Sequence, residues 1–136
     1  MPQRSPPPAG DRCSAHYADG LRAHAILLQH CTECGHVRYP AAPICPQCWS
    51  ERAEWRPHCS CGEVTSFVWY MESLHPNFTE IPYNVTLVRL DAGPVVVSSL
   101  PDATIDSLRV GDRVHATFSD EPGGFSVLLF EKDQEA

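Results

Sequence analysis

Four cysteines form the pattern with the clearest chemical meaning in this sequence. Cys31 and Cys34 make one Cys-x-x-Cys pair, Cys45 and Cys48 make a second, and ten residues separate the two pairs. A Cys-x-x-Cys turn points both of its sulfurs at one place, so two such turns together present four thiolates to one metal ion. Zinc prefers this tetrahedral sulfur set, and four protein ligands leave no position open for water. The spacing therefore predicts one structural Zn²⁺ per chain.

Other interpretations of the cysteines stay open at this stage. The pairs are also compatible with two unrelated redox motifs, and Cys59 and Cys61 are compatible with a ligand set shared with Cys45 and Cys48. A Cys-x-Cys pair chelates a metal less well than Cys-x-x-Cys, so we expect Cys59 and Cys61 to be two small buried thiols between modules. Cys13 is assigned no role.

The seven histidines are scattered along the chain. We expect His30 and His36 to lie on the surface of the ribbon. His58 is not expected to activate Cys59, because neighbouring residues on a strand point to opposite faces. His75 lies in the longest loop, where binding residues are common. The remaining histidines show no partner spacing: His16, His24 and His115.

The sequence shows no pattern typical of an active site. No Ser/His/Asp set, no glycine-rich phosphate loop and no paired carboxylates are visible. We therefore expect a protein that is not an enzyme by itself.

The elements that must position these residues follow from composition and periodicity. The chain has 136 residues, of which 43% are hydrophobic and 20% charged, which indicates globular folding. Residues 1–16 are rich in proline and predict a disordered arm. Residues 17–58 are predicted to hold a short helix, capped by Asp19 and running through Leu21 and Ala25, followed by the ribbon with a strand at 37–39.

The second module, residues 59–131, has the alternation of β-strands. Runs of β-branched and aromatic residues are separated by turn signals and predict five strands, at 64–70, 83–90, 94–100, 113–118 and 125–130. Five short strands joined by turns favour a small closed barrel or a sandwich.

Charge is distributed unevenly between the two modules. The whole chain carries −7, with +1 on residues 1–58 and −8 on residues 59–136. So acidic a barrel repels a phosphate backbone, which argues against a nucleic acid as partner. No apolar run approaches the ~18 residues of a membrane span, and the N-terminus lacks an apolar signal core. These features predict a cytoplasmic protein without a membrane partner, with cysteines that bind metal rather than form disulfides.

The ribbon carries the best candidates for contacts with another molecule. Arg38, Arg52 and Arg56 are suited to phosphate groups or to an acidic protein face. Trp49 and Trp55 flank Arg52, and aromatic residues with arginine are frequent anchors of protein interfaces. The same two tryptophans are equally suited to the core of a small ribbon, and the arginines to a solvated surface.

The order of these motifs resembles that of the zinc-ribbon plus OB-fold proteins that accompany thiolases and thiolase-like acyltransferases and aldolases. The resemblance covers about residues 17–130. The segments that carry it are residues 27–31, 39–40, 43–46, Trp55, and residues 62–67, 81–85 and 110–114. One segment departs from the family: Cys59-Ser60-Cys61-Gly62 stands where a Ser-Gly-x-Gly-like turn is usual.

The resemblance implies both a fold and a function. The implied fold is mostly β, with a rubredoxin-like zinc ribbon followed by a five-stranded OB-fold barrel. The implied function is a non-catalytic accessory or scaffold subunit that binds a thiolase-like enzyme and contacts coenzyme A thioesters or the partner. From their charge, aromatic character or loop position, the candidates for such contacts are Arg38, Arg52, Arg56, Trp49, Trp55 and His75.

Two functions of other classes are also compatible with parts of the sequence. OB barrels and zinc ribbons often bind single-stranded nucleic acid, but the barrel is acidic and has no basic stripe interleaved with aromatic residues. A stand-alone acyl-CoA-binding protein or thioester enzyme would use Cys59 or His75. Turnover of acyl-CoA that Cys59→Ser abolishes would favour that alternative.

Overall fold

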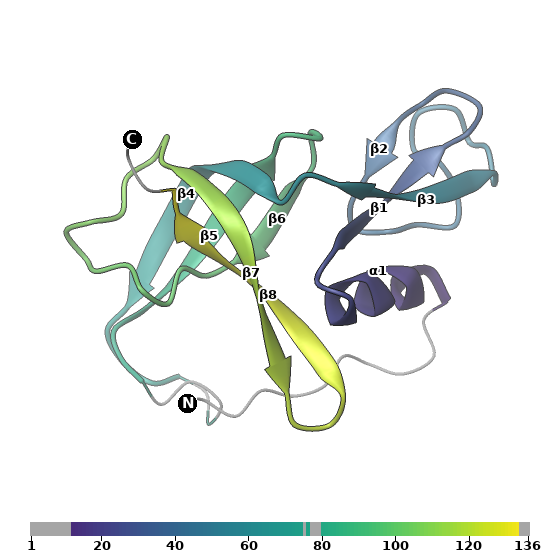
Figure 1. Ribbon diagram of the computed structural model, residues 1–136. Helices are drawn as coiled ribbons and strands as arrows, with labels where there is room; N and C mark the ends of the chain where they lie inside the picture. The colour runs from purple at the N-terminus through teal and green to yellow at the C-terminus, as the bar shows by residue number, and fades with distance from the viewer. Residues whose placement is uncertain (1–11, 75, 77–79, 134–136) are drawn as a thin grey trace.

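The computed structural model of the chain describes residues 12–74, 76 and 80–133. Within them the chain forms a small ribbon and a barrel that lie side by side (Figure 1). The elements in chain order are α1 (Arg12–Arg22), β1 (Ile26–Cys31), β2 (Val37–Arg38), β3 (Ala53–His58), β4 (Cys61–Tyr70), β5 (Tyr83–Leu90), β6 (Val95–Ser98), β7 (Arg113–Glu121) and β8 (Phe125–Lys132).

The ribbon is a three-stranded antiparallel sheet with the order β2-β1-β3. β1 pairs with β3 along its whole length, from Ile26 opposite His58 to Cys31 opposite Ala53. The strand predicted at 37–39 is confirmed as β2. β1 and β3 were not predicted, because β1 is short and the sequence of β3 has no alternation of apolar and polar residues.

The barrel is a five-stranded antiparallel sheet with the order β6-β5-β4-β7-β8. All five predicted strands are found close to their predicted positions. The two edge strands meet, since the Ser98 hydroxyl donates to the Leu128 carbonyl at 2.7 Å and the Phe130 N–H donates to the Ser99 carbonyl at 3.0 Å. These bonds nearly close the sheet, so a mostly β chain with a ribbon followed by an OB-type barrel is confirmed.

One hydrophobic core fills the barrel and extends into the first strand of the ribbon. Its fully buried members include Val64, Val88, Val96, Val114 and Phe130 of the barrel, together with Ile26 and Leu28 of β1. Gly62 lets β4 and β5 approach, because a Cβ at this position would lie 2.7 Å from the Arg89 carbonyl oxygen. The ribbon sheet is therefore anchored at its base by the core of the barrel.

The helix lies earlier in the chain than the sequence predicted. α1 begins at Arg12 instead of near Asp19, so residues 12–16 are helical rather than part of an arm. Residues 1–11 lie outside the described residues. The helix ends before Ala25, because His24 adopts a left-handed φ of 58° and the Ala25 N–H donates to the Gly20 carbonyl at 2.8 Å. This closing pattern is the usual C-terminal cap of a helix, normally formed with glycine.

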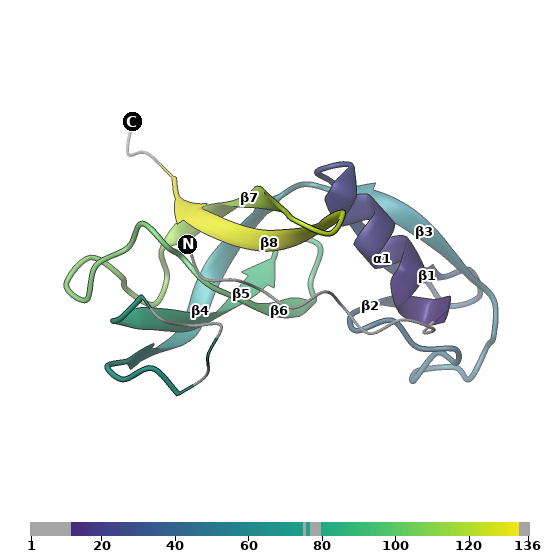
Figure 2. The same cartoon turned by 90° about the horizontal axis from the view of Figure 1, so that it is seen from below.

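α1 joins the two modules. It lies along β1 and against the β7–β8 hairpin (Figure 2). Tyr17 packs on Tyr39 of the ribbon with ring centroids 5.1 Å apart, and Leu21 on the same helix face is buried in the core. At its end His24 stacks on Phe118 of β7 and its Nε2 lies 3.0 Å from an Asp120 carboxylate oxygen. Within the described residues this one helix is too short and polar to cross a bilayer.

Candidate metal centre

The sulfurs of the two Cys-x-x-Cys pairs converge on one point. Cys31 Sγ lies 3.5 Å from Cys48 Sγ, Cys34 Sγ lies 3.6 Å from Cys45 Sγ, and all four sulfurs lie within 4.8 Å of one another. A tetrahedron with zinc–sulfur bonds of about 2.3 Å places its sulfurs about 3.8 Å apart. The geometry therefore fits a four-thiolate zinc site.

Two similar turns hold the cysteines in place. In the first, the Gly35 N–H donates to the Cys31 carbonyl at 2.9 Å, and Gly35 has a φ of 79°. In the second, the Trp49 N–H donates to the Cys45 carbonyl at 2.9 Å, and Trp49 has a φ of 66°. Gly35 adopts the left-handed conformation at no steric cost, whereas the second turn places a tryptophan in a conformation that favours glycine.

The electrostatics of the four thiols call for a cation. The Cys34 N–H is the main cause that lowers the pKa of Cys31 to about 6. At Cys48 the Ser50 N–H acts to lower the pKa, but burial and the neighbouring thiols outweigh it and raise the pKa to about 12. The thiols cannot all ionise side by side unless a positive charge offsets their repulsion, and a bound divalent metal ion supplies that charge.

The three ribbon arginines have different surroundings. Arg52 is 81% exposed and its Nη1 lies 3.8 Å from a Glu33 carboxylate oxygen, and Arg56 pairs with Glu54 on the same strand. Arg38 is only 5% exposed and its Nη2 donates to the Ala42 carbonyl at 3.0 Å. The Nε and Nη1 atoms of Arg38 are buried and have no hydrogen-bond partner among the described residues.

The two candidate tryptophans also differ. Trp49 follows the second cysteine pair and is 80% exposed. Trp55 on β3 is half-buried and stacks on His16 of α1, with ring centroids 5.2 Å apart. Trp55 therefore packs within the molecule, while Trp49 presents its ring to solvent. His75, the sixth contact candidate, lies outside the described residues.

His30 was expected at the surface, and this expectation is wrong. Its side chain is buried and stacks on His58, with ring centroids 4.7 Å apart and the two Nε2 atoms 2.5 Å apart. Burial is the main cause that lowers the pKa of His30, and the charges of His58 and Arg56 lower it further. His30 is buried because β1 pairs with β3, and this pairing was not predicted. His36, the other residue of that expectation, is half-buried.

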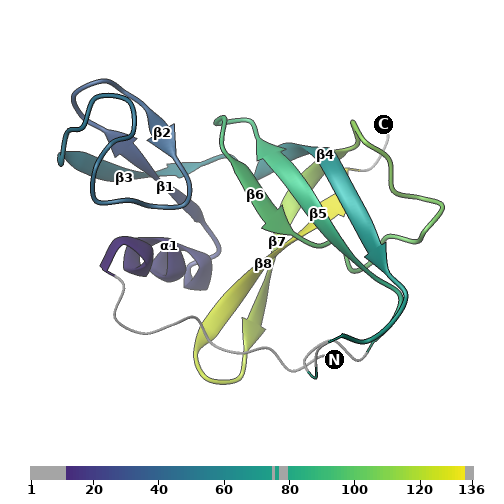
Figure 3. The same ribbon diagram turned by 180° about the vertical axis from the view of Figure 1, so that it is seen from behind.

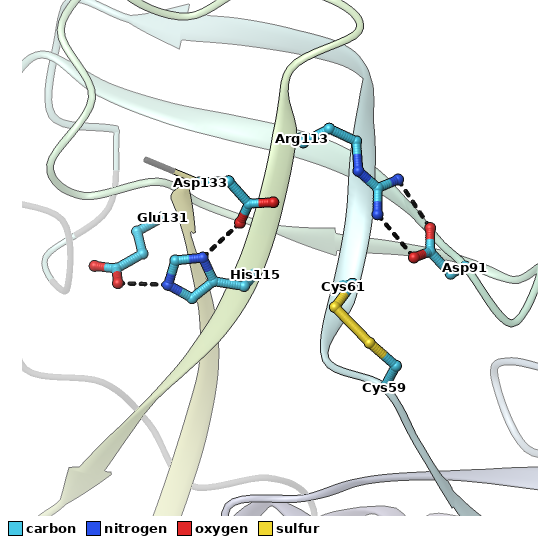
Figure 4. A network of polar contacts seen from close by, with 7 residues as sticks. All are labelled: Cys59, Cys61, Asp91, Arg113, His115, Glu131 and Asp133. Carbon is cyan, nitrogen blue, oxygen red and sulfur yellow. Dashed lines mark hydrogen bonds and ion pairs between the residues drawn. A yellow bond between two sulfur atoms is a disulfide. The ribbon is translucent and has the colours of Figure 1, made fainter. Parts of the chain in front are cut away.

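Cys59 and Cys61 form a disulfide where β3 passes into β4 (Figure 4). The prediction of two buried thiols is therefore wrong, because the two sulfurs are bonded and Cys59 is exposed. Neither cysteine joins the four-sulfur cluster. Residues two apart on an extended chain point to the same face, which brings these sulfurs together. Beside the disulfide, Asp91 accepts two hydrogen bonds from Arg113, at 2.9 and 2.7 Å, and they hold the pKa of Asp91 below its usual range.

His115 also has partners that the spacing of the sequence did not indicate. Its Nδ1 lies 2.7 Å from an Asp133 carboxylate oxygen and its Nε2 lies 2.6 Å from a Glu131 carboxylate oxygen (Figure 4). The hydrogen bond with Asp133 and then that with Glu131 raise the pKa of His115. All three residues lie on or next to the β7–β8 pair, so only the register of that pair brings them together.

A ribbon with four converging cysteines, followed by a nearly closed five-stranded barrel, defines a zinc-ribbon plus OB-fold protein. Comparison with known families agrees over both modules. Residues 18–54 match the ChsH2 rubredoxin-like zinc ribbon domain, and residues 55–119 match the ChsH2 C-terminal OB-fold domain. The chain belongs to this ChsH2-type, or DUF35, family, as the order of its motifs predicted.

This chain matches different shares of the length of its individual relatives. A probable enoyl-CoA hydratase alpha subunit of Thermomonospora curvata is 31% identical over 78% of this chain, which spans only 33% of that relative. A DUF35 domain-containing scaffold protein of Methanothermobacter thermautotrophicus is 32% identical over 65% of this chain and 67% of the relative. A solved chain described as Ltp2-ChsH2(DUF35) aldolase superposes with a TM-score of 0.85 and 26% identity, over 93% of this chain and 98% of that one.

Proposed function

We propose that this chain is a non-catalytic accessory subunit that binds a thiolase-like acyl-transferring enzyme or aldolase. The observation that carries the proposal is the similarity, over ribbon and barrel together, to a chain of the solved Ltp2-ChsH2 aldolase. The similarity to a DUF35 scaffold protein supports the same role. Fold likeness by itself does not define chemistry, so the proposal also rests on what the site offers.

The site offers binding rather than covalent chemistry. Cys59, the nucleophile of the thioester-enzyme alternative, is bonded to Cys61 and has no thiol in this structure. The four converging cysteines hold one structural Zn²⁺ per chain, and four protein ligands leave the ion no open position for a substrate. The ion fixes the two turns that carry Trp49 and the neighbouring ribbon surface.

The ribbon side is the proposed contact face. Trp49 is the large exposed aromatic residue there, and such residues anchor many protein interfaces. Together with Arg38, Arg52, Arg56, Trp55 and His75, it would contact the partner enzyme or a coenzyme A thioester at the interface. A cytoplasmic location suits the four thiolates that hold zinc, because cytosolic thiols are kept reduced. The Cys59–Cys61 disulfide would have to resist reduction to persist there.

Co-expression of the tagged chain with thiolase-like proteins encoded beside it tests the proposal. The expected result is a hetero-oligomer that survives size-exclusion chromatography, with its mass measured by light scattering. The control is Cys45→Ser, which removes one metal ligand and should abolish the complex. A chain that elutes alone in every pairing, or that turns over acyl-CoA alone, would contradict the proposal.

A further inference from the structure

A second cluster of metal-ligating side chains lies where β3 passes into β4 (Figure 4). The sulfurs of Cys59 and Cys61 and one carboxylate oxygen of Asp91 all lie within 4.8 Å of one another. The two cysteines belong to the junction between ribbon and barrel, whereas Asp91 directly follows β5. Figure 3 shows the turn between β5 and β6 on the side of the barrel that faces the ribbon. The cluster therefore brings the link between the modules next to a turn of the barrel.

Backbone hydrogen bonds hold this cluster in place without help from the disulfide. The Asp91 N–H donates to the Cys61 carbonyl at 3.0 Å, and the Ala116 N–H donates to the Ser60 carbonyl at 2.7 Å. The disulfide itself joins residues two apart, and a disulfide that closes so short a loop adds less stability than one that closes a long loop. Its opening should therefore leave both sulfurs on the same side of the chain, beside Asp91.

The disulfide is open to reduction, because Cys59 is exposed and a thiolate in solution can reach its sulfur. The first thiolate of a dithiol reductant attacks the Cys59 sulfur and expels Cys61 as a thiolate, and the second then attacks the mixed disulfide. Cys59 and Cys61 gain two electrons and two protons, and the reductant becomes a disulfide. A divalent ion that binds both sulfurs displaces these two protons.

Asp91 has ligand capacity left although Arg113 binds it. Arg113 donates one hydrogen bond to each carboxylate oxygen, at 2.9 and 2.7 Å, and a carboxylate offers about four lone-pair sites. Carboxylates that bind a metal are commonly oriented by such a hydrogen-bonding neighbour. Two thiolates and Asp91 carry three negative charges and Arg113 carries one positive charge, so a divalent ion makes the site neutral.

We propose that reduced Cys59 and Cys61, together with Asp91, form a second site for a thiophilic divalent ion such as Zn²⁺. Thiolate sulfur and carboxylate oxygen are both regular zinc ligands, and three protein ligands leave the fourth position to water. The site differs from that of the ribbon because it exists only when the disulfide is open. A bound ion fixes the link between the modules to the turn after β5, and it needs no partner enzyme.

Metal binding by the intact chain in two redox states tests the proposal. The zinc-loaded chain is left oxidised, or reduced with a phosphine that gel filtration then removes, and both samples are titrated with Zn²⁺ without oxygen. Native mass spectrometry should show one ion on the oxidised chain and two on the reduced chain. Bound Zn²⁺ should also protect Cys59 from alkylation by iodoacetamide. The same number of ions in both states, or unprotected Cys59, would overturn the proposal.

Variants separate a built site from adventitious binding by two free thiols. Asp91→Asn and Arg113→Gln both break the ion pair, but only Asp91→Asn removes a ligand. The reduced Asp91→Asn chain should bind the second ion at least about 10-fold more weakly than reduced Arg113→Gln, since even residues that only orient a ligand contribute about 10–100-fold to metal affinity.

Cys13→Ser is the matched control, because it removes a thiol elsewhere in the sequence. Its reduced form should bind the second ion like the natural chain. Equal affinity in Asp91→Asn and Arg113→Gln, with the ribbon zinc retained in both, would mean adventitious binding only. That result, or loss of the second ion in Cys13→Ser, would overturn the inference.

Discussion

The ribbon and the barrel are stabilised by different interactions, although both are antiparallel sheets. The barrel encloses a core with fully buried aliphatic and aromatic side chains on every strand, among them Val64, Val88, Val96, Val114 and Phe130. Between residues 32 and 58 the only fully buried hydrophobic side chain is Cys45, one of the predicted metal ligands. A region of this size with so little core requires a cross-link, and a metal ion bound by the four converging cysteines would provide it.

The difference shows how one short chain combines two kinds of stability. The barrel folds around apolar surface that its own strands bury. The turns of the ribbon are fixed by four sulfurs, which leaves side chains such as Trp49 free to face outward. The part of the chain that depends on the cysteines is smaller than the ribbon module. Ile26 and Leu28 of β1 lie in the ribbon but belong to the core of the barrel. Metal-dependent order should therefore begin near Cys31.

The largest effect is expected at the metal ligands. Cys45→Ser should release the zinc ion and unfold the turns between residues 31 and 50, because the apparent binding free energy of such sites is about 10–16 kcal/mol. Metal analysis and the NMR signals of the ribbon measure the result. Cys13→Ser, the control, should leave both unchanged. Stoichiometric zinc retained in Cys45→Ser would contradict the assignment of the ligands.

In the barrel the corresponding change removes core volume. Phe130→Ala should lower the free energy of unfolding by about 3–5 kcal/mol, because the ring is fully buried and leaves a cavity. Urea unfolding monitored by circular dichroism measures the change, and zinc content should stay stoichiometric at low denaturant. Val97→Ala on an exposed side chain is the control, with an effect within about 0.5 kcal/mol. An equal loss in both variants would contradict the assigned core.

A smaller effect is expected at the buried polar residue of β5. Asn84 donates to the Leu100 carbonyl at 2.9 Å and accepts from the Leu100 N–H at 2.9 Å, which fixes the chain after β6. Asn84→Ala should cost about 2–3 kcal/mol of unfolding free energy, because it leaves buried backbone groups unpaired. Glu51→Ala, at an exposed side chain, is the control. A cost no larger than that of the control would show that water replaces Asn84.

The smallest effect depends on pH. Because Asp133 and Glu131 raise the pKa of His115 above its unfolded value of about 6.5, the protonated ring stabilises the folded chain. This stabilisation is fully present below pH about 6.5 and is lost as the pH rises through the folded pKa. The stability difference between the natural chain and His115→Gln should therefore be larger at pH about 6 than at pH about 9. A difference that grows with pH would have the wrong sign.

The sequence predicted the parts of the fold that have local signatures. Alternating β-branched residues located the strands of the barrel, and the Cys-x-x-Cys spacing located the cysteines that converge in space. β3 was missed because its residues, Ala53–His58, gain their strand structure from pairing with β1 rather than from their own propensity. The start of α1 was missed because the expected cap, Asp19, lies inside the helix.

The remaining features of the site depend on contacts between distant residues. The His30–His58 stack, the carboxylates at His115 and the buried position of Arg38 all require the strand register, which spacing along the chain does not reveal. The Cys59–Cys61 disulfide joins residues that are close in sequence. It was missed because cysteines in the cytosol are normally reduced, which led us to predict two free thiols. Sequence therefore identified the four cysteines that converge but did not separate Arg38 from Arg52 and Arg56.

Hydrogen exchange before and after chelation of the metal tests the contrast between ribbon and barrel most directly. With zinc removed from the intact chain, we predict that amides between residues 31 and 50 exchange rapidly, while those of β4, β5, β7 and β8 keep their protection. Unchanged protection of the ribbon after complete metal removal, or loss of protection in both modules at once, would contradict the account.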